Sequence, residues 1–209
     1  MISDQAHKQP ILSKEFSIPE NQTTYRILVF IKETLPKFKF LFTESNTMIH
    51  REDDISKELA RFFNEKAWLQ NLYFRFNEKK GVDFTIYVNP FKMGVPSVFM
   101  IEAKRLSKIH RDYVAGRTGG IERIKKEQDE FGKHLNYGAM IGYIQDENIE
   151  YWKNKINGWI TDLIIEVTDI DWQEQDKMIA EDTISDFKSI HSRISKESIT
   201  LYHYWITLN

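Results

Sequence analysis

The sequence predicts an α/β protein in which a mixed central β-sheet is flanked by α-helices. Apolar runs of strand length, rich in β-branched and aromatic residues, lie at Leu72–Phe76, Val98–Ile101 and Gly138–Ile144. Segments with apolar residues at helical spacing lie before and after them, at 47–68 and 147–164. The 209 residues are 41% hydrophobic and 29% charged, which is enough for a core and fits one sizeable domain.

The N-terminal third is expected to be an arm followed by two helices. Residues 1–20 are polar with two prolines and predict a flexible arm, so the single domain would span 21–209. The segment 25–37 predicts a helix that ends at Pro36, although its β-branched residues leave a strand open. Asn46 or Thr47 would cap the second helix, whose inward stripe is Ile55, Leu59, Phe62 and Phe63.

One strand carries two charges on the same face. After the apolar run Val98–Ile101 come Glu102 and Lys104, two residues apart, and strand side chains alternate between faces. A second strand, 81–88, has Asp83 at its start, and the turn-rich loop 89–96 would join the two strands as a hairpin. The hairpin brings Asp83 within reach of Glu102 and Lys104. Two carboxylates and a lysine suit a divalent metal and an activated water, although a salt-bridged strand end would look the same.

This pattern resembles the core of the PD-(D/E)XK nuclease superfamily, the restriction-endonuclease-like fold. Acid-x-Lys occurs three times, but only Glu102-x-Lys104 follows an apolar run and a strand that starts with an acid. Val82 stands where the family name has proline, which weakens the recognition more than the chemistry. The resemblance implies Mg²⁺, for which Mn²⁺ can substitute, held by Asp83, Glu102 and the carbonyl of Ala103.

The resemblance also implies a catalytic role for Lys104 and for an acid from the helix before the hairpin. Glu52 and Glu58 border the apolar stripe of that helix on opposite sides, and we favour Glu52. An acid in the first turn is equally well explained by the helix dipole.

A basic segment follows the predicted site. Residues 104–126 hold eight basic side chains and two acids, which suits a polyanionic substrate, although a solvated helix face has the same composition. A glycine-rich turn precedes a helix predicted from Ile121 to Leu135, where backbone amides would bind phosphate. Gln128 is the polar residue on the inward stripe, and it would face the site or bond a backbone group. The predicted nucleic-acid contacts are Arg105, Arg117, Gly119, Gly120, Arg123 and Lys126.

The motif Tyr113-Val114-Ala115-Gly116, the Gly119-Gly120-Ile121-x-Arg123 motif and the strand at 139–144 are similar to a bacterial restriction-endonuclease-like group. That similarity places the strand beside the Glu102 strand after a helical crossover.

The C-terminal part predicts a core helix at 147–164 and a closing pair of strands at 184–194 and 199–208. Residues 162–186 hold nine acids and one lysine and predict a solvated connection without a metal site. His191 lies on the first closing strand and could assist a phosphate contact, although a lone histidine on a strand is more often structural.

The sequence therefore predicts a Mg²⁺-dependent phosphodiesterase that cleaves nucleic acid, with an endonuclease acting on DNA favoured, in restriction or phage defence. The alternatives are a non-catalytic nucleic-acid-binding or regulatory module that retains the fold, and a homodimer or subunit of a larger defence assembly. The absence of cysteine fits a reducing cytoplasm, and no apolar run approaches transmembrane length. A cytoplasmic protein without membrane partners is expected.

Overall fold

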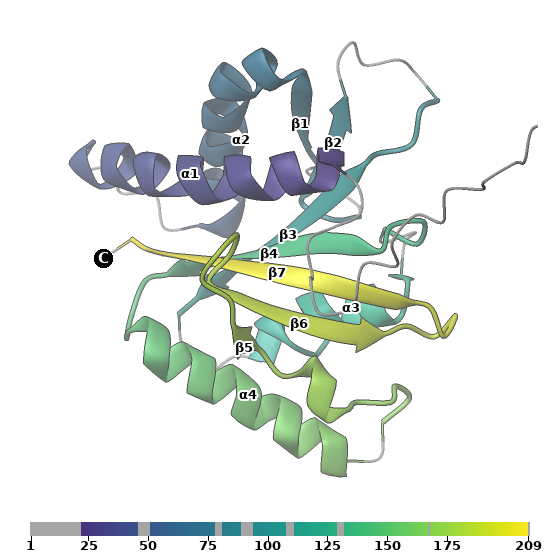
Figure 1. Ribbon diagram of the computed structural model, residues 1–209. Helices are drawn as coiled ribbons and strands as arrows, with labels where there is room; N and C mark the ends of the chain where they lie inside the picture. Colours follow the sequence, from purple (N-terminus) through teal and green to yellow (C-terminus); the bar gives the residue numbers. More distant parts are fainter. Residues whose placement is uncertain are drawn as a thin grey trace, which may run out of the picture.

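A seven-stranded mixed sheet forms the centre of the computed structural model (Figure 1). The structure describes residues 22–45, 51–77, 81–88, 94–107, 111–128, 132–166 and 168–208, so the predicted arm and the predicted caps Asn46 and Thr47 lie outside the described residues. In spatial order the strands are β1 (Leu72–Phe76), β2 (Phe84–Val88), β3 (Phe99–Leu106), β4 (Tyr137–Ile144), β7 (Ser198–Thr207), β6 (Phe187–Ser192) and β5 (Ile179–Ala180).

The pairing of the strands confirms the predicted hairpin, crossover and closing pair. β1, β2 and β3 pair antiparallel, whereas β3, β4 and β7 pair parallel. β7 then pairs antiparallel with β6, and β6 with β5. The strand that carries Glu102 and Lys104 is therefore internal, which explains why its residues from Phe99 to Lys104 are all buried.

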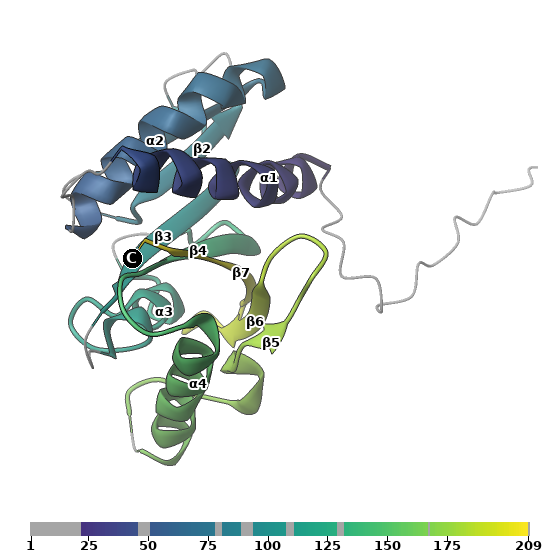
Figure 2. The ribbon, with the colours of Figure 1, turned by 90° about the vertical axis from the view of Figure 1, so that its left-hand side faces the viewer.

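Two N-terminal helices, α1 (Gln22–Glu44) and α2 (Glu52–Ala67), cover one face of the sheet (Figure 2). Phe30 of α1 packs against Phe63 of α2 and Phe74 of β1, with ring centroids 5.5 and 5.4 Å away. The prediction that α1 ends at Pro36 was wrong, because the helix continues for two turns beyond it. Phe38, after the proline, is buried against Phe62, and this burial offsets the lost backbone hydrogen bond.

The opposite face is covered by α3 (Gly120–Lys125), α4 (Ile149–Ile165) and two short 3₁₀ turns, η2 (Arg111–Tyr113) and η4 (Glu174–Asp176). The core helix α4 is confirmed, with its predicted stripe of Trp152, Ile156 and Ile160 buried. The prediction for α3 was too long. It has six residues, and Leu135 lies outside it.

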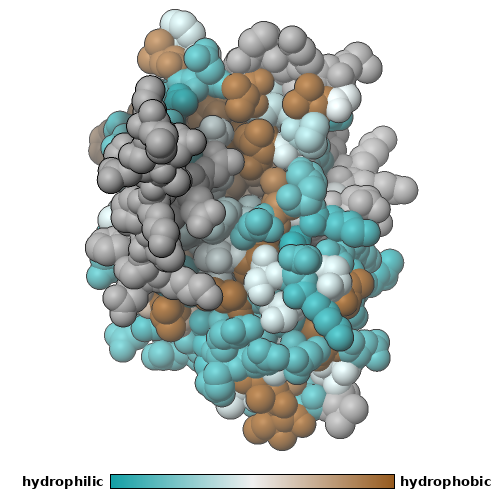
Figure 3. All heavy atoms as spheres, turned by 45° about the vertical axis from the view of Figure 1, so that its right-hand side comes forward, coloured by the Kyte–Doolittle hydropathy of each residue, from teal (hydrophilic) through white to brown (hydrophobic). Residues whose placement is uncertain are grey.

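Among the described residues, none of the helices has both the length and the apolar character needed to cross a bilayer. On the face shown in Figure 3, hydrophobic residues form small groups separated by hydrophilic ones. A third short turn, η1 (Trp68–Gln70), links α2 to β1.

Candidate active site

Asp83 and Glu102 meet where the hairpin ladder between β2 and β3 ends. The last paired residues are Phe84 and Ile101, so Asp83 stands opposite Glu102 at the next position. Beyond this pair, bonds between side chain and backbone join the two strands in place of ladder bonds. The Ala103 N–H donates to Asp83 Oδ2 at 2.7 Å, and the Asp83 N–H donates to Glu102 Oε2 at 3.3 Å. The predicted meeting of these two acids is thus present, and each carboxylate is fixed by the other strand's backbone.

The ammonium group of Lys104 is surrounded by carboxylates. Its Nζ lies 2.8 Å from Glu102 Oε1, 3.1 Å from Glu52 Oε1 and 4.0 Å from Asp83 Oδ2. Only 8% of the Lys104 side chain and 1% of the Glu102 side chain are exposed. Such burial is tolerated because each charge faces an opposite one.

Glu52, the first residue of α2, reaches this cluster from the helical layer that covers one face of the sheet. Its Oε2 accepts the Arg105 N–H at 2.7 Å while its Oε1 accepts from Lys104. Glu58, the other predicted helix acid, is exposed and lies 3.7 Å from Arg61 on the same helix. The structure therefore brings Glu52 into the cluster and leaves Glu58 outside it.

Electrostatics at the cluster favour a protonated Asp83 and a charged lysine. Burial, reinforced by Glu102, raises the pKa of Asp83 to about 8, although Lys104 works against this. Burial likewise raises the pKa of Glu102, opposed by Lys104 and Arg123. Burial would lower the pKa of Lys104, but the carboxylates around it outweigh this effect and raise its pKa. Lys104 is therefore an ammonium at neutral pH, and Asp83 holds its proton unless another cation replaces it.

Arg123, predicted as a contact to neighbouring phosphates, points into the cluster. Its Nη1 lies 3.4 Å from Glu102 Oε1, and its Nη2 donates to the Gly81 carbonyl at 3.5 Å. Gly120 allows α3 to lie close to the sheet, because a Cβ there would lie 2.7 Å from Met140 Cε of β4 and 3.3 Å from the Tyr113 carbonyl oxygen. The glycine of the predicted turn thus serves close packing of α3 on β4.

The remaining predicted nucleic-acid contacts differ in accessibility. Arg105 and Arg117 are exposed, whereas Lys126 is bonded to Glu122 at 2.6 Å. The predicted phosphate site at the start of α3 is not supported, because both glycines are buried and the Gly119 N–H donates to Gly116. Gln128 is exposed, so the prediction that it faces inward was wrong.

His191 is fully buried in a hydrogen-bonded network away from Lys104, which agrees with the structural interpretation of this residue.

Sequence reasoning missed Asn77, whose backbone N–H donates to the Asp83 carbonyl and whose side-chain amide donates to the Val82 carbonyl, both at 2.8 Å. Its place directly after the strand 72–76, as a turn-forming residue, was the available signal.

The donor set at the hairpin end matches a hard divalent cation in chemical type. In a strand, the N–H and C=O of one residue face the same neighbour, so the Ala103 carbonyl faces the side on which its N–H meets Asp83. Within the described part of the chain, no group of three or more His, Asp or Glu side chains is arranged to hold a metal. Magnesium is commonly held by one or two carboxylates together with waters and substrate phosphates. Asp83, Glu102 and this carbonyl therefore supply ligands of the type that magnesium takes.

Comparisons with family models, with curated proteins and with solved structures give no match to this chain.

Proposed function

We propose that this chain is a metal-dependent phosphodiesterase that cleaves nucleic acid, with DNA the favoured substrate. The observation that carries the proposal is the convergence of Glu52, Asp83 and Glu102 on Lys104 at the end of a hairpin. Buried ionisable groups with displaced pKa values are typical of catalytic sites. Three acids from separate segments surround one lysine, and one of them would be enough to neutralise its charge.

The fold supports a restriction-endonuclease-like core. An antiparallel hairpin with an acid at its open end is followed by a short helix and a strand parallel to the acid-x-Lys strand. This is the order that the sequence resemblance implies. Function is inferred from the site and not from the fold, because one fold hosts many activities.

Asp83, Glu102 and the Ala103 carbonyl would hold Mg²⁺ or Mn²⁺. The bound cation would polarise the scissile phosphate and lower the pKa of a coordinated water. Asp83 must release its proton for an ion to bind.

Lys104 would place its positive charge beside the phosphate that is attacked. Because its pKa is raised, it acts as a charge-stabilising and water-orienting group and not as a proton acceptor. Glu52 would hold Lys104 in place, since one of its oxygens bonds Nζ and the other bonds the next backbone amide. The exposed Arg105 and Arg117 would contact neighbouring phosphates without reading sequence.

A non-catalytic nucleic-acid-binding module is the second candidate, and one observation favours it. Glu102 is 1% exposed and already neutralised by Lys104 and Arg123, so the cluster is stable as an internal salt-bridge network. Such a module would bind nucleic acid without metal-dependent turnover.

The test is to incubate purified protein with plasmid, linear and single-stranded DNA and with RNA, in Mg²⁺, Mn²⁺ or EDTA. We expect cleavage of at least one substrate with Mg²⁺ or Mn²⁺, none in EDTA, and none by Lys104→Ala or Asp83→Asn. Equal cleavage by the wild type and both variants would exclude these residues, and binding without cleavage under every condition would favour the second candidate.

A further inference from the structure

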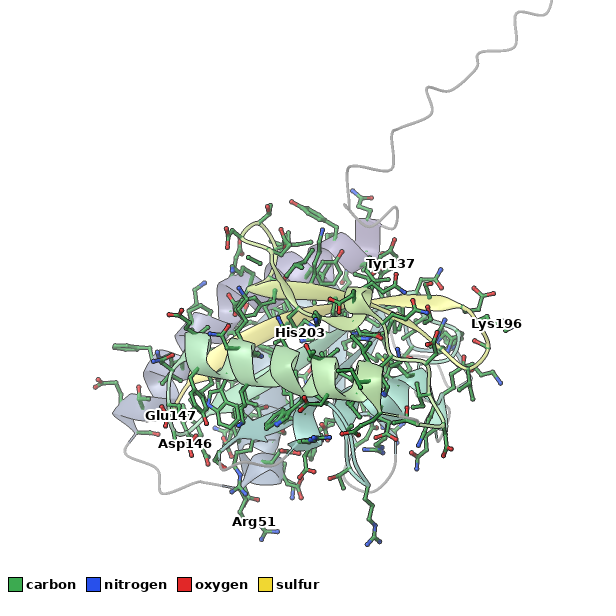
Figure 4. The ribbon with its side chains drawn as sticks, turned by 90° about the horizontal axis from the view of Figure 1, so that it is seen from below. Arg51, Tyr137, Asp146, Glu147, Lys196 and His203 are labelled. Atoms are coloured by element: carbon green, nitrogen blue, oxygen red, sulfur yellow. The ribbon has the colours of Figure 1, made fainter. Side chains whose placement is uncertain are left out.

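A continuous chain of buried hydrogen bonds crosses the face of the sheet that α3 and α4 cover. It begins at Trp205 of β7, whose Nε1–H donates to the Tyr113 hydroxyl at 3.0 Å. The Tyr113 hydroxyl meets His203 Nδ1 at 2.8 Å, and His203 Nε2 meets the Ser189 hydroxyl at 2.7 Å. In Figure 4, His203 lies inside the molecule, whereas Lys196, in the turn between β6 and β7, lies at the rim.

The chain continues from Ser189 to the acid-rich connection. The Ser189 hydroxyl meets His191 Nε2 at 2.6 Å, and His191 Nδ1 meets Asp176 Oδ1 at 2.5 Å. Asp176 also accepts from Lys125 Nζ, at 2.7 Å to each oxygen. Asp176, Lys125 and His191 are each 0% exposed. The prediction that residues 162–186 are a purely solvated connection was therefore wrong at Asp176.

With both histidine rings neutral, the Asp176 end sets the direction of every proton in this chain, because a carboxylate can only accept. Indole nitrogen can only donate, so the Tyr113 hydroxyl accepts from Trp205 and has its own proton left for His203 Nδ1. His203 then carries its proton on Nε2 and donates to Ser189, which donates to His191 Nε2. His191 carries its proton on Nδ1 and donates to the Asp176 carboxylate, which can only accept. Both histidines are neutral in this arrangement, and burial lowers the pKa of each.

The two ends of this chain hold the two ends of one short segment. Tyr113 precedes the glycine-rich turn, and Lys125 is the last residue of α3, so the segment 113–125 is tied at both ends. A helix of six residues is not stable in isolation, and its position depends on such contacts. Lys125 and Arg123 lie two residues apart, about 200° around a helix, so fixing Lys125 toward Asp176 turns Arg123 toward Glu102.

We propose that Asp176 is a positioning residue that acts through Lys125 to hold α3 in the rotation that places Arg123 against Glu102. The inference rests on the proposed function, because its catalytic consequence requires the cluster around Lys104 to be an active site. Its structural part is independent of that function. A positive charge beside Glu102 fixes the orientation of this carboxylate, so loss of the clamp would misplace a group that the reaction needs.

The first measurement is ¹⁵N NMR of the histidine rings in the full chain. We expect both rings to be neutral at pH 7, with the proton on Nε2 of His203 and on Nδ1 of His191. The reverse tautomer at either ring, or a charged ring, would overturn the chain and with it the clamp.

The second measurement compares amide hydrogen exchange in the wild type with that in two variants. Lys125→Met combined with Asp176→Asn removes the charged contact and leaves no buried charge unpaired, and Ser189→Ala interrupts the chain at its centre. We expect exchange of the Glu122, Arg123 and Lys126 amides to accelerate at least tenfold, while β4 amides stay unchanged. The matched control is Glu174→Gln, which removes an exposed pair with Lys177 on the same turn. Unchanged exchange in α3 in both variants would overturn the clamp.

The third measurement is a double-mutant cycle on kcat for metal-dependent cleavage. Arg123→Gln and the Lys125→Met/Asp176→Asn pair should each lower kcat at least tenfold with little change in KM. Their combination should be no slower than Arg123→Gln alone, since both act through one contact. The positioning role would be overturned if the losses in kcat multiply in the combined variant. It would also be overturned if the Lys125→Met/Asp176→Asn pair keeps full activity although its α3 amides exchange faster. Absence of cleavage by the wild type would instead refute the proposed function and leave the first two results standing.

Discussion

Asp83 accepts a hydrogen bond from the backbone N–H of Ala103 at 2.7 Å, and this bond fixes an acid from one strand beside the acid-x-Lys motif of the next. The bond stands where the main-chain ladder of the hairpin stops. It therefore fixes the Asp83 carboxylate and keeps the Ala103 backbone facing it.

Replacing Glu52 by Gln should reduce cleavage at least tenfold while nucleic-acid affinity changes by less than about twofold. The amide keeps the size of the side chain but loses the charge that holds Lys104 at 3.1 Å. Glu58→Gln on the same helix is the matched control, because Glu58 is exposed and outside the cluster. Steady-state kinetics and a binding titration measure both effects, and equal loss in the two variants would show that Glu52 contributes only to the helix.

Arg117→Ala should weaken DNA binding about equally for all sequences and lower the salt slope of log K by about one. Arg123→Ala should instead reduce cleavage and leave the salt slope nearly unchanged, because its guanidinium faces Glu102. Fluorescence anisotropy at several salt concentrations measures the slopes. Equal slopes for Arg117→Ala and the wild type would mean that the exposed arginine is only solvated.

In EDTA, Asp83 should make the protein less stable as the pH rises from about 4 to about 8. Burial raises the pKa of Asp83 from 3.8 to about 8, so in this range the folded chain keeps a proton that the unfolded chain has released. The stability from this proton is fully present below pH 3.8 and is lost as the pH rises through about 8.

Urea unfolding of the wild type and Asp83→Asn at pH 5 and pH 8 isolates this effect. The difference in free energy of unfolding, variant minus wild type, should increase from pH 5 to pH 8 by more than about 1.4 kcal/mol, which is the equivalent of one pKa unit. A difference that does not change with pH would mean that Asp83 titrates normally.

The meeting of Asp83, Glu102 and Lys104 was predictable because it follows from strand alternation and hairpin closure, which are local rules. The roles of Arg123 and Lys125 were not predictable from the sequence. A run of basic residues has the same sequence pattern whether its members face solvent or buried acids, and only tertiary packing separates the two. Asp176 was hidden in the same way among surface acids.

Lengths of helices were predicted least well. α1 passes through Pro36 because Phe38 gains burial beyond it, and α3 stops at Lys125, although apolar spacing predicted a helix as far as Leu135. In both cases contacts distant in sequence outweigh the local signal.

The central claim is that Asp83 and Glu102 hold a divalent cation beside Lys104, and titration of the protein with Mn²⁺ followed by electron paramagnetic resonance tests it most directly. The free Mn²⁺ signal should fall as the wild type and Glu58→Gln bind the ion, and this loss should disappear in Asp83→Asn and Glu102→Gln. Equal Mn²⁺ binding by all four proteins, or none by the wild type, would contradict the account.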